Sequence, residues 1–545
     1  MTLTHAERAL IARYREALTS EADTRRNGVS MRVVARSGRR LTLAFVERTP
    51  VVPDARELGG LLVWASDGLG KHRWCKVIPI VDGQHVVVVV PQREQPSVGT
   101  LADLRDSKLE DLLFRDWWSD DANARDAMLV RRRLLRDPVT VPTAHDAPRW
   151  IGVTPTQARA FDLARCSDAF LFGPPGSGKT RTLLAMMIAF LLQPGSQRRR
   201  ARYFAMTRKG REHAEALAEE LLNPAHTPRW LDVKRVAGVR KRIAFFADFD
   251  LAQAEARASE LDEELIVIDD ANQLTAPHAL ALRTAVDRSA RGAHGSASSE
   301  WRLRCVWSGD RRGMRPIVHT SNPRHASVLK DSLLVNIDRS AHAIALSHIE
   351  RSPESISRVI IAMRAEHGEP APTYLDFDLN AERPRHGHRR DDAFTTRTVS
   401  VGTDVTHAVR SSRCTKAVAD LATSRIIEHA DMAILCPDRS RRDKIRAALA
   451  RDSRAPKIRG ALEKRGVFEA DATAAEMVST IAKIMGAEVD DVIVDFTDLP
   501  APVQDDPGAL RALLVAAISR ARRRCTVVIP SDKLAHPAIK QLRSL

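Results

Sequence analysis

The spacing of apolar residues changes several times along the chain, and each change predicts a new kind of element. Residues 4–22 place apolar side chains near a helical period, which predicts an amphipathic N-terminal helix. Between residues 31 and 91, five short β-rich runs alternate with turn pairs such as Asp67-Gly68, which predicts a small antiparallel β-barrel. Helical spacing returns over residues 101–136 and predicts a pair of stalk-like helices.

From about residue 154 onward, short apolar runs alternate with helical stretches, which is typical of parallel sheets covered on both faces. The runs of a first sheet are Ala169–Phe172, Arg202–Met206, Glu264–Ile268 and Cys305–Ser308. A second series of strands and helices is predicted around Ala343–Leu346, Met432–Leu435, Met477–Ile481, Asp491–Asp495 and Cys525–Ile529. Residues 288–299 and 370–390 have the composition of loops.

These patterns predict an α/β fold class with two tandem parallel-sheet domains, preceded by the small β-barrel and its stalk helices. The predicted boundaries are an N-terminal helix over 1–30, the barrel over 31–100, stalk helices over 101–149, a first parallel-sheet domain over 150–335 and a second over 336–545. A chain of 545 residues is long enough for several domains, each with its own core.

Composition adds that the chain has the character of a soluble globular protein, with 44% hydrophobic and 28% charged residues. Its longest apolar stretches, residues 183–192 and 85–91, are shorter than the roughly 20 residues that span a bilayer. The first residues lack the pattern of a secretion signal, so we expect a cytoplasmic protein with no membrane partner. The six cysteines show no Cys-x-x-Cys spacing, which argues against a zinc site or a disulfide framework and favours buried thiols.

The net charge of +16, from 85 Lys and Arg against 69 Asp and Glu, favours a polyanionic partner such as nucleic acid. An arginine-rich composition also arises from genome base bias, so charge alone leaves both explanations open. Arginine runs such as Arg198–Arg200, Arg311–Arg312 and Arg522–Arg524 fit either a nucleic-acid groove or a solvated face. Tryptophans such as Trp117 and Trp118 are expected to pack in the core rather than to stack on bases.

The segment Gly173-Pro-Pro-Gly-Ser-Gly-Lys179-Thr180 lies directly after a predicted strand and before a predicted helix, as a phosphate-binding loop does. Glycines let backbone N–H groups approach phosphates, and the N-terminus of the helix favours their negative charge. In such a loop, Lys179 contacts the β- and γ-phosphates and Thr180 holds magnesium. The segment therefore predicts binding of a nucleoside triphosphate, ATP, with Mg²⁺.

An apolar strand, Leu265–Ile268, ends in the two carboxylates Asp269 and Asp270. Asp269 at the tip of the strand is suited to bind magnesium through water, and Asp270 is suited to orient the attacking water. As a pattern alone, the pair also fits a solvated strand end. The phosphate loop upstream favours the catalytic interpretation.

Segments around these two motifs resemble the motif series of superfamily 1 helicases, in the same order along the chain. In the first predicted domain they are Thr154–Ala160 (the adenine-reading Q motif), Ala205–Ala214 (motif Ia), Val233–Gly238 (motif Ib), Asp269-Asp-Ala-Asn-Gln273 (motif II) and Ser308–Pro316 (motif III). In the second they are Ile349–Ile356 (the Asn-Tyr-Arg-Ser-Pro-x-x-Ile motif), Ser479–Asp495 (motif V) and Ala517–Arg522 (motif VI). The resemblance covers residues 150–530 approximately and is closest to superfamily 1B, the 5'-to-3' branch typified by the nonsense-mediated-decay helicase and its DNA-processing relatives.

This resemblance implies two RecA-like lobes with ATP bound in the cleft between them. Lys179, Thr180 and Asp269 of the first lobe would bind ATP and Mg²⁺. Arg351 and Arg520 of the second lobe would neutralise charge that develops on the γ-phosphate. The implied nucleotide-binding residues are Gln157, Gly173, Pro174, Pro175, Gly176, Ser177, Gly178, Lys179, Thr180, Arg181, Gly486 and Glu488. Contacts to the phosphates of a nucleic-acid strand are expected from Thr207, Thr480 and Lys483, with solvated surface as the alternative for each.

Four positions depart from the family pattern and bear on turnover. Asp270 stands where relatives carry glutamate, which draws the carboxylate back by about 1 Å. Gly313 and Met485 replace the glutamines of motifs III and V, and Glu350 replaces a tyrosine beside Arg351. The leading hypothesis is an ATP-dependent helicase or single-strand translocase that acts on DNA or RNA. The alternatives are an ATP-binding nucleic-acid switch or clamp with weak hydrolysis inside a larger protein complex, and a RecA-fold NTPase that acts on something other than nucleic acid.

Overall fold

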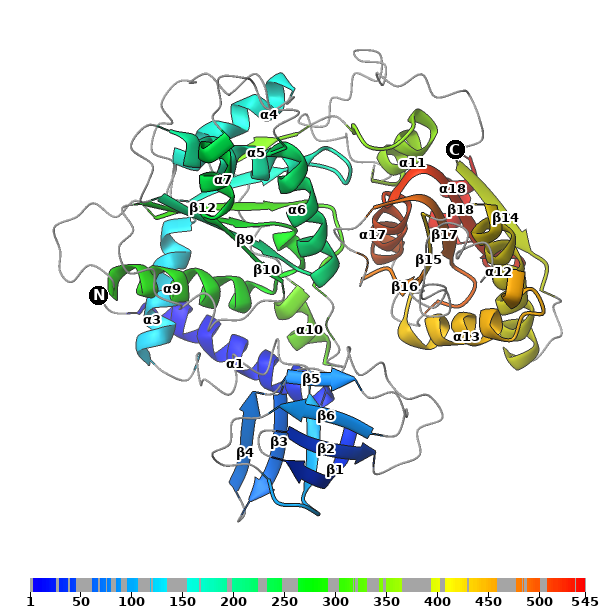
Figure 1. The fold of residues 1–545 in the computed structure, drawn as a ribbon, viewed down its shortest axis with the longest axis horizontal. Coiled ribbons are helices and arrows are strands. Elements are labelled where there is room, and N and C mark those ends of the chain that lie inside the picture. The colour runs from blue at the N-terminus through cyan, green and yellow to red at the C-terminus, as the bar shows by residue number, and fades with distance from the viewer. Residues whose placement is uncertain are drawn as a thin grey trace.

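The computed structural model describes the chain in segments that form three groups, each built around one sheet (Figure 1). The described residues are 3–25, 29–37, 40–45, 61–66, 69–74, 76–79, 85–89, 96–105, 118, 121–134, 154–165, 168–193, 199–223, 233–247, 263–292, 303–316, 318, 322–330, 343–346, 349–364, 394–401, 407–428, 431–457, 477–482, 484, 488–499, 507–534 and 536–544.

The N-terminal sheet is antiparallel, as predicted, and its strand order is β4-β3-β7-β1-β2-β6-β5. Its strands are β1 (Val29–Ser37), β2 (Arg40–Phe45), β3 (Leu61–Ser66), β4 (Leu69–Trp74), β5 (Lys76–Pro79), β6 (His85–Val89) and β7 (Leu101–Arg105). Residues 101–105, predicted to be helical, form a strand because they pair with both β1 and β3. The run predicted as one strand from residue 74 onward is divided between β4 and β5. Closure of this sheet into a barrel stays a prediction.

Two helices that flank this sheet in sequence lie beside each other in space. They are α1 (His5–Arg25), which confirms the predicted N-terminal helix, and α3 (Asp121–Leu134). The ring of Tyr14 meets the ring of Trp118 edge-on with centroids 5.2 Å apart, and Arg132 Nε donates to Glu7 Oε1 at 2.6 Å. Trp118 is buried in this contact, as expected of a core residue. The other predicted stalk helix falls on residues 106–117, outside the described residues.

The first parallel sheet has the strand order β10-β9-β11-β12-β8-β13. Its strands are β8 (Asp168–Phe172), β9 (Arg199–Ala205), β10 (Ile243–Ala247), β11 (Glu263–Ile268), β12 (Leu303–Gly309) and β13 (Ala343–Ala345). The run at 343–346 is predicted to belong to the second series of strands, and this prediction is wrong because β13 pairs with β8 and extends the first sheet beyond residue 335. All its neighbouring strands are parallel, as the alternation of strands and helices predicts.

Alternate residues of these strands face two different helical layers, because successive side chains of a strand point to opposite faces. On β8, Ala169 and Leu171 pack with one layer, whereas Phe170 and Phe172 pack with the other. The first layer contains η2 (Ala160–Arg165), α5 (Lys179–Leu192), α6 (Arg208–Leu221) and α7 (Val233–Arg240), and α4 (Pro155–Arg159) leads directly into η2. The other contains α9 (Ala276–Gly292), α10 (Pro323–Lys330), α1 and α3. This sheet and its two layers are called the first lobe below.

The second parallel sheet has the order β14-β18-β17-β15-β16 and lies apart from the first (Figure 1). Its strands are β14 (Phe394–Val399), β15 (Met432–Cys436), β16 (Val478–Thr480), β17 (Val489–Asp495) and β18 (Ala521–Pro530). Its helices are α11 (Glu354–Arg364), α17 (Pro507–Ile518) and α18 (Pro537–Ser544) on one face, and α12 (His407–Glu428) and α13 (Arg439–Ala450) on the other. This second lobe and the first, each with an all-parallel sheet, fit RecA-like folds.

Several simpler expectations can be compared with the described residues. Cys305, Cys414, Cys436 and Cys525 are buried, as expected of core thiols. Across the described helices, none combines the length and the apolar character that crossing a bilayer requires. Helix α9 continues to Gly292, so the start of the loop predicted at 288–299 is helical. The loop predicted at 370–390 falls outside the described residues.

Candidate nucleotide-binding site

The phosphate-binding loop predicted at residues 173–180 connects β8 to α5, at the carboxyl edge of the first parallel sheet. Gly178 has a φ of 80°, in the left-handed region that a side chain disfavours, and a Cβ there would lie 2.4 Å from Gln157 Nε2. Ser177 Oγ donates to Pro174 O at 2.9 Å and so closes the turn. The loop therefore presents its backbone at the N-terminus of α5, which favours anions.

Lys179 is the first residue of α5, and its side chain folds back over the loop. Its ammonium group donates to Gly173 O at 2.9 Å and to Pro174 O at 3.0 Å. Burial lowers the pKa of Lys179, while the nearby charges of Asp270 and Asp310 act in the opposite direction. The structure thus holds a buried cation at the loop where phosphates are expected.

Asp269 follows β11 and is buried beside the start of α5. Its Oδ2 accepts two short hydrogen bonds, from Thr180 Oγ1 at 2.6 Å and from the hydroxyl of Tyr203 at 2.6 Å. The Thr180 hydroxyl and the Asp269 carboxylate lie together, and both supply oxygen atoms of the kind that Mg²⁺ prefers as ligands. These residues fit the expected metal, and Thr180 and Asp269 are the two that would hold it.

Tyr203, on β9, was not predicted as a site residue. Burial raises the pKa of Tyr203 well above its usual range, and the charge of Asp269 adds to this effect. The hydroxyl therefore stays protonated and remains a donor that fixes the orientation of Asp269. In the sequence, Tyr203 is recognisable only as a polar hydroxyl within the apolar run that predicts β9. The pattern of a strand does not show which carboxylate such a hydroxyl will contact.

Asp270 lies directly before the short helix η4 (Ala271–Gln273) and has a left-handed backbone, with φ 53°. Its N–H donates to Asp269 Oδ1 at 3.0 Å. Burial raises the pKa of the Asp270 carboxyl and the charge of Asp269 raises it further, whereas Lys179, Arg520 and Arg351 oppose this. Two carboxylates therefore compete for the same cations. A divalent cation at Asp269 would favour ionised Asp270, as a base requires.

The second lobe contributes Arg351 directly at the phosphate loop. The backbone N–H groups of Glu350 and Arg351 both donate to Gly176 O, at 2.9 Å and 3.3 Å. The Arg351 guanidinium donates to Ser519 O at 3.0 Å and forms an ion pair with Glu488. The structure thus brings a predicted arginine of the second lobe against the loop of the first.

Arg520 follows α17 and is buried behind Arg351. Its Nε donates to Ala516 O at 3.1 Å and its Nη2 donates to Ser519 Oγ at 3.1 Å. Burial lowers the pKa of Arg520 to about 10, and the like charge of Arg351 lowers it too, whereas Asp270 opposes the change. Two guanidinium groups in one enclosed place favour an additional anion between them.

Gln157 and Glu488 complete the contacts around the loop. Gln157 is part of a capping box with Thr154, and its Nε2 donates to Ser177 O at 3.3 Å and to Glu350 Oε2 at 3.4 Å. Glu350, which replaces the tyrosine of the family pattern, thereby links the Q-motif segment to the second lobe. Burial would raise the pKa of Glu488, but Arg351 and the nearby His213 lower it to about 2.

The remaining predicted residues have other contacts or fall outside the described residues. Arg181 pairs with Glu220 of α6 at 3.4 Å. Thr207 caps α6, since its hydroxyl accepts from Gly210 N at 2.9 Å. Thr480 ends β16 and is buried. Lys483 and Gly486, together with Met485, fall outside the described residues. Nucleic-acid contacts of Thr207, Thr480 and Lys483 stay predictions.

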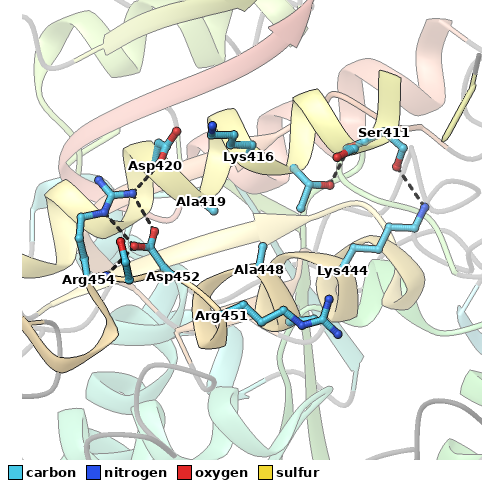
Figure 2. A pocket seen from close by; sticks show the side chains of 13 residues that line it. Ser411, Lys416, Ala419, Asp420, Lys444, Ala448, Arg451, Asp452 and Arg454 are labelled. Atoms are coloured by element: carbon cyan, nitrogen blue, oxygen red, sulfur yellow. Dashed lines mark hydrogen bonds and ion pairs between the residues drawn. The ribbon is translucent and has the colours of Figure 1, made fainter. Parts of the chain in front are cut away.

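A cavity of about 700 Å³ lies elsewhere, between α12 and α13 of the second lobe (Figure 2). None of the predicted site residues lines it. Figure 2 shows Arg454 between Asp420 and Asp452, and Lys444 Nζ lies 3.3 Å from Ser411 Oγ. Arg454 and Lys444 therefore have partners within the cavity wall, and the candidate site remains the phosphate loop with the second-lobe residues that contact it.

Comparison with known families agrees with this geometry. Residues 157–293 match a family model described as an AAA domain, which is found in superfamily 1 helicases. The chain has a P-loop domain of the helicase-like type. The matched range starts at Gln157, contains Lys179, Asp269 and Asp270, and ends just after α9. No curated protein matches the chain. The match supports a P-loop NTPase and hence nucleotide binding.

Proposed function

We propose that the protein is an ATP-dependent nucleic-acid helicase or single-strand translocase of superfamily 1B, which hydrolyses ATP in the cleft between its two lobes. The observation that carries this proposal is the contact between Arg351 and the phosphate loop. The Arg351 N–H donates to Gly176 O, its guanidinium pairs with Glu488, and Arg520 is buried beside it. A P-loop that needed only to bind nucleotide would not require cations from a second lobe.

The chemistry of hydrolysis divides between the two lobes. The loop backbone and Lys179 bind the phosphates, and Thr180 and Asp269 hold Mg²⁺. When bound, Mg²⁺ neutralises the phosphate oxygens. Asp270 accepts a proton from the attacking water and orients it. Arg351 and Arg520 stabilise charge that develops on the γ-phosphate oxygens, a stabilisation that depends on closure of the lobes.

Nucleic acid is the proposed partner, because the net charge of +16 favours a polyanion and because the motif series resembles helicases. Thr207, Thr480 and Lys483 are the proposed contacts to strand phosphates. Opening and closing of the cleft would change the affinity of the lobes for the strand, which is how hydrolysis drives translocation.

The test is steady-state ATP hydrolysis by the purified protein, with and without single-stranded DNA or RNA. We expect stimulation by at least one of them, and we expect Lys179→Ala to reduce hydrolysis to background. Lys444→Ala, at the α12–α13 cavity, is the matched lysine control and should retain activity. If neither nucleic acid stimulates hydrolysis, the proposal fails. Strand displacement from duplexes with a 5' or a 3' tail then determines the direction.

The position of Asp270 favours a second candidate, an ATP-binding switch or clamp on nucleic acid with weak hydrolysis inside a larger complex. Its carboxylate is one methylene shorter than the glutamate of the family pattern and leaves a left-handed backbone position, so it is a poor match for a long glutamate base. Under this alternative, turnover stays well below one per second and Asp270→Glu accelerates it. Several turnovers per second in the unmodified protein would exclude the switch.

A further inference from the structure

Asn272 fastens two segments of the first lobe together, only two residues beyond Asp270. Its Oδ1 accepts from Asp310 N at 3.1 Å, and its Nδ2 donates to Met314 O at 2.9 Å. The buried Asn272 amide thus forms hydrogen bonds with both ends of the turn at residues 310–314, which follows β12. Any displacement of the η4 segment that carries Asp270 will therefore move this turn.

The turn itself is too tight for a side chain at Gly313. Gly313 N donates to Asp310 O at 3.0 Å. A Cβ at Gly313 would lie 2.9 Å from Asp310 Cβ and 3.1 Å from Asn272 Nδ2. The glutamine that the family pattern places here would push these atoms apart. The family's glutamine is therefore absent from a turn that is too compact to hold it. This compact turn connects Asn272 to the end of β12.

The same turn is joined to the second lobe through Arg364, the last residue of α11. Arg364 Nη2 donates to Asp310 Oδ1 at 2.7 Å, and Nη1 pairs with the other carboxylate oxygen. In return, Arg312 Nη1 donates to Arg364 O at 2.9 Å. Arg312 thus contacts the second lobe. From sequence alone, the run Arg311–Arg312 is expected to line either a nucleic-acid groove or a solvated face. Only 5% of the Arg364 side chain and 7% of the Asp310 side chain is exposed, so solvent screens the pair weakly.

Apolar packing reinforces this connection. Met314 belongs to the same buried cluster as Ile356, Ile360 and Met363 of α11. Helix α11 in turn packs against α17, the helix that ends just before Arg520. A continuous series of contacts therefore runs from Asp270 through Asn272 and the turn to α11, which begins just after Arg351, and to α17, which ends just before Arg520.

We propose that the Asp310–Arg364 ion pair, held by Asn272, is the linkage through which the nucleotide state of the cleft sets the position of the second lobe. The inference rests on the proposed function, since it names the residues that couple ATP binding to strand binding. Arg364 acts as a positioning residue: its guanidinium is occupied by Asp310. A two-pronged Arg–carboxylate contact fixes both distance and orientation, whereas a single flexible contact would allow the lobes to slip.

The experiment measures coupling directly. The affinity for a labelled single-stranded oligothymidylate, and for an oligouridylate, is determined by fluorescence anisotropy with and without a non-hydrolysable ATP analogue. The ratio of the two dissociation constants is the coupling factor, expected at about 5- to 150-fold in the unmodified protein. Arg364→Gln should bring the ratio close to one, while direct titration with a fluorescent nucleotide shows retained nucleotide affinity. A purely structural defect would weaken both.

A second variant guards against unfolding, because Arg364→Gln leaves the Asp310 carboxylate buried without its partner. The double variant Asp310→Asn, Arg364→Gln removes both charges and should fold while still lacking coupling. Arg364→Lys keeps the charge but loses the two-pronged contact, so it should recover only part of the ratio. Arg358→Gln is the matched control on α11, because Arg358 is exposed and pairs only along its own helix with Glu354.

The outcomes separate the two proposals. If the unmodified protein shows neither nucleic-acid-stimulated hydrolysis nor a coupling factor, the proposed function fails. If the unmodified protein is coupled and the folded double variant is coupled to the same extent, the linkage through Arg364 is wrong and the proposed function stands. Loss of coupling in Arg358→Gln would also overturn the linkage, since that change leaves Asp310 and Arg364 intact.

Discussion

The two walls of the cleft hold their functional groups by different means. In the first lobe, Lys179 donates to backbone carbonyls, and Asp269 accepts from the neutral hydroxyls of Thr180 and Tyr203. In the second lobe, Arg351 is paired with the carboxylate of Glu488, and Arg520 lies buried next to it. The first wall is thus ordered by hydrogen bonds within the protein, while the second combines an ion pair with like charges close together.

This difference separates two tasks. A pre-arranged loop contributes to binding in the ground state, which changes KM more than kcat. Cations that meet charge only as it develops contribute to the transition state, which changes kcat. The comparison therefore predicts that loss of a supporting group in the first wall, the Tyr203 hydroxyl, changes the requirement for Mg²⁺, whereas loss of Arg520 in the second wall changes kcat.

The largest expected effect is on turnover, from Arg520→Ala in the second wall. We expect kcat for ATP to fall by about 10³- to 10⁵-fold, the range associated with an arginine that stabilises phosphoryl transfer. Nucleotide affinity should change far less. Arg522→Ala is the control, since Arg522 is exposed and pairs with Asp431 outside the cleft. An equal loss of affinity and turnover would contradict the division of tasks.

The next effect is on stability and concerns Glu488→Gln. The pKa of Glu488 is lowered to about 2 from an ordinary value of 4.5, so its stabilising contribution is complete above pH 4.5 and disappears as pH falls towards 2. At pH 7 the variant should be less stable by up to about 3 kcal/mol. Urea unfolding at a series of pH values should show this difference closing in acid.

A second carboxylate serves as the control for that series. Hydrogen bonds from Arg454 lower the pKa of Asp452 to about 2, and Asp452 lies at the α12–α13 cavity. Asp452→Asn should therefore reproduce a pH-dependent loss of stability without altering ATP turnover. A stability difference for Glu488→Gln that stays constant from pH 7 to pH 2 would mean that the carboxylate charge is not what stabilises the second wall.

The smallest effect should come from the first wall, with Tyr203→Phe. Loss of one hydroxyl leaves Asp269 Oδ2 with Thr180 Oγ1 as its remaining described side-chain donor. Supporting donors of this kind are typically worth 10- to 100-fold in metal affinity or activity. We expect ATP hydrolysis to need more Mg²⁺ and to recover at saturating Mg²⁺. Tyr14→Phe, on the N-terminal helix, should leave the Mg²⁺ dependence unchanged. A defect in Tyr203→Phe that Mg²⁺ cannot rescue would assign Tyr203 a different role.

Sequence alone predicts the parts of this site that are contiguous. The loop at 173–180 and the strand end at Asp269 carry their local context with them, and the structure places Lys179, Thr180 and Asp269 together. Tyr203, Asn272 and Arg364 could not be found in this way, because each acts through a partner on a different segment. A local sequence pattern does not show which distant residue a given side chain will contact.

The same limit explains the errors in the fold. The short run at 343–345 is apolar enough for any buried strand, and only its pairing with β8 shows that it belongs to the first sheet. Residues 101–105 fit a helical period, but their pairing with β1 and β3 makes them a strand. Long-range pairing outweighs local preference where a segment is short.

The clasp between α1 and α3 has a consequence for how the chain can be engineered. Arg132 donates a hydrogen bond to Glu7, and the ring of Tyr14 contacts the ring of Trp118. The chain therefore leaves the first lobe after α1 and returns to it at Trp118 and α3. The seven-stranded sheet lies between these two points in the sequence. The N-terminal sheet is thus an insertion whose two connections to the first lobe lie close together. A short linker that joins the end of α1 to the chain just before Trp118 should yield a trimmed protein that keeps both contacts, and other modules could be exchanged at the same junction.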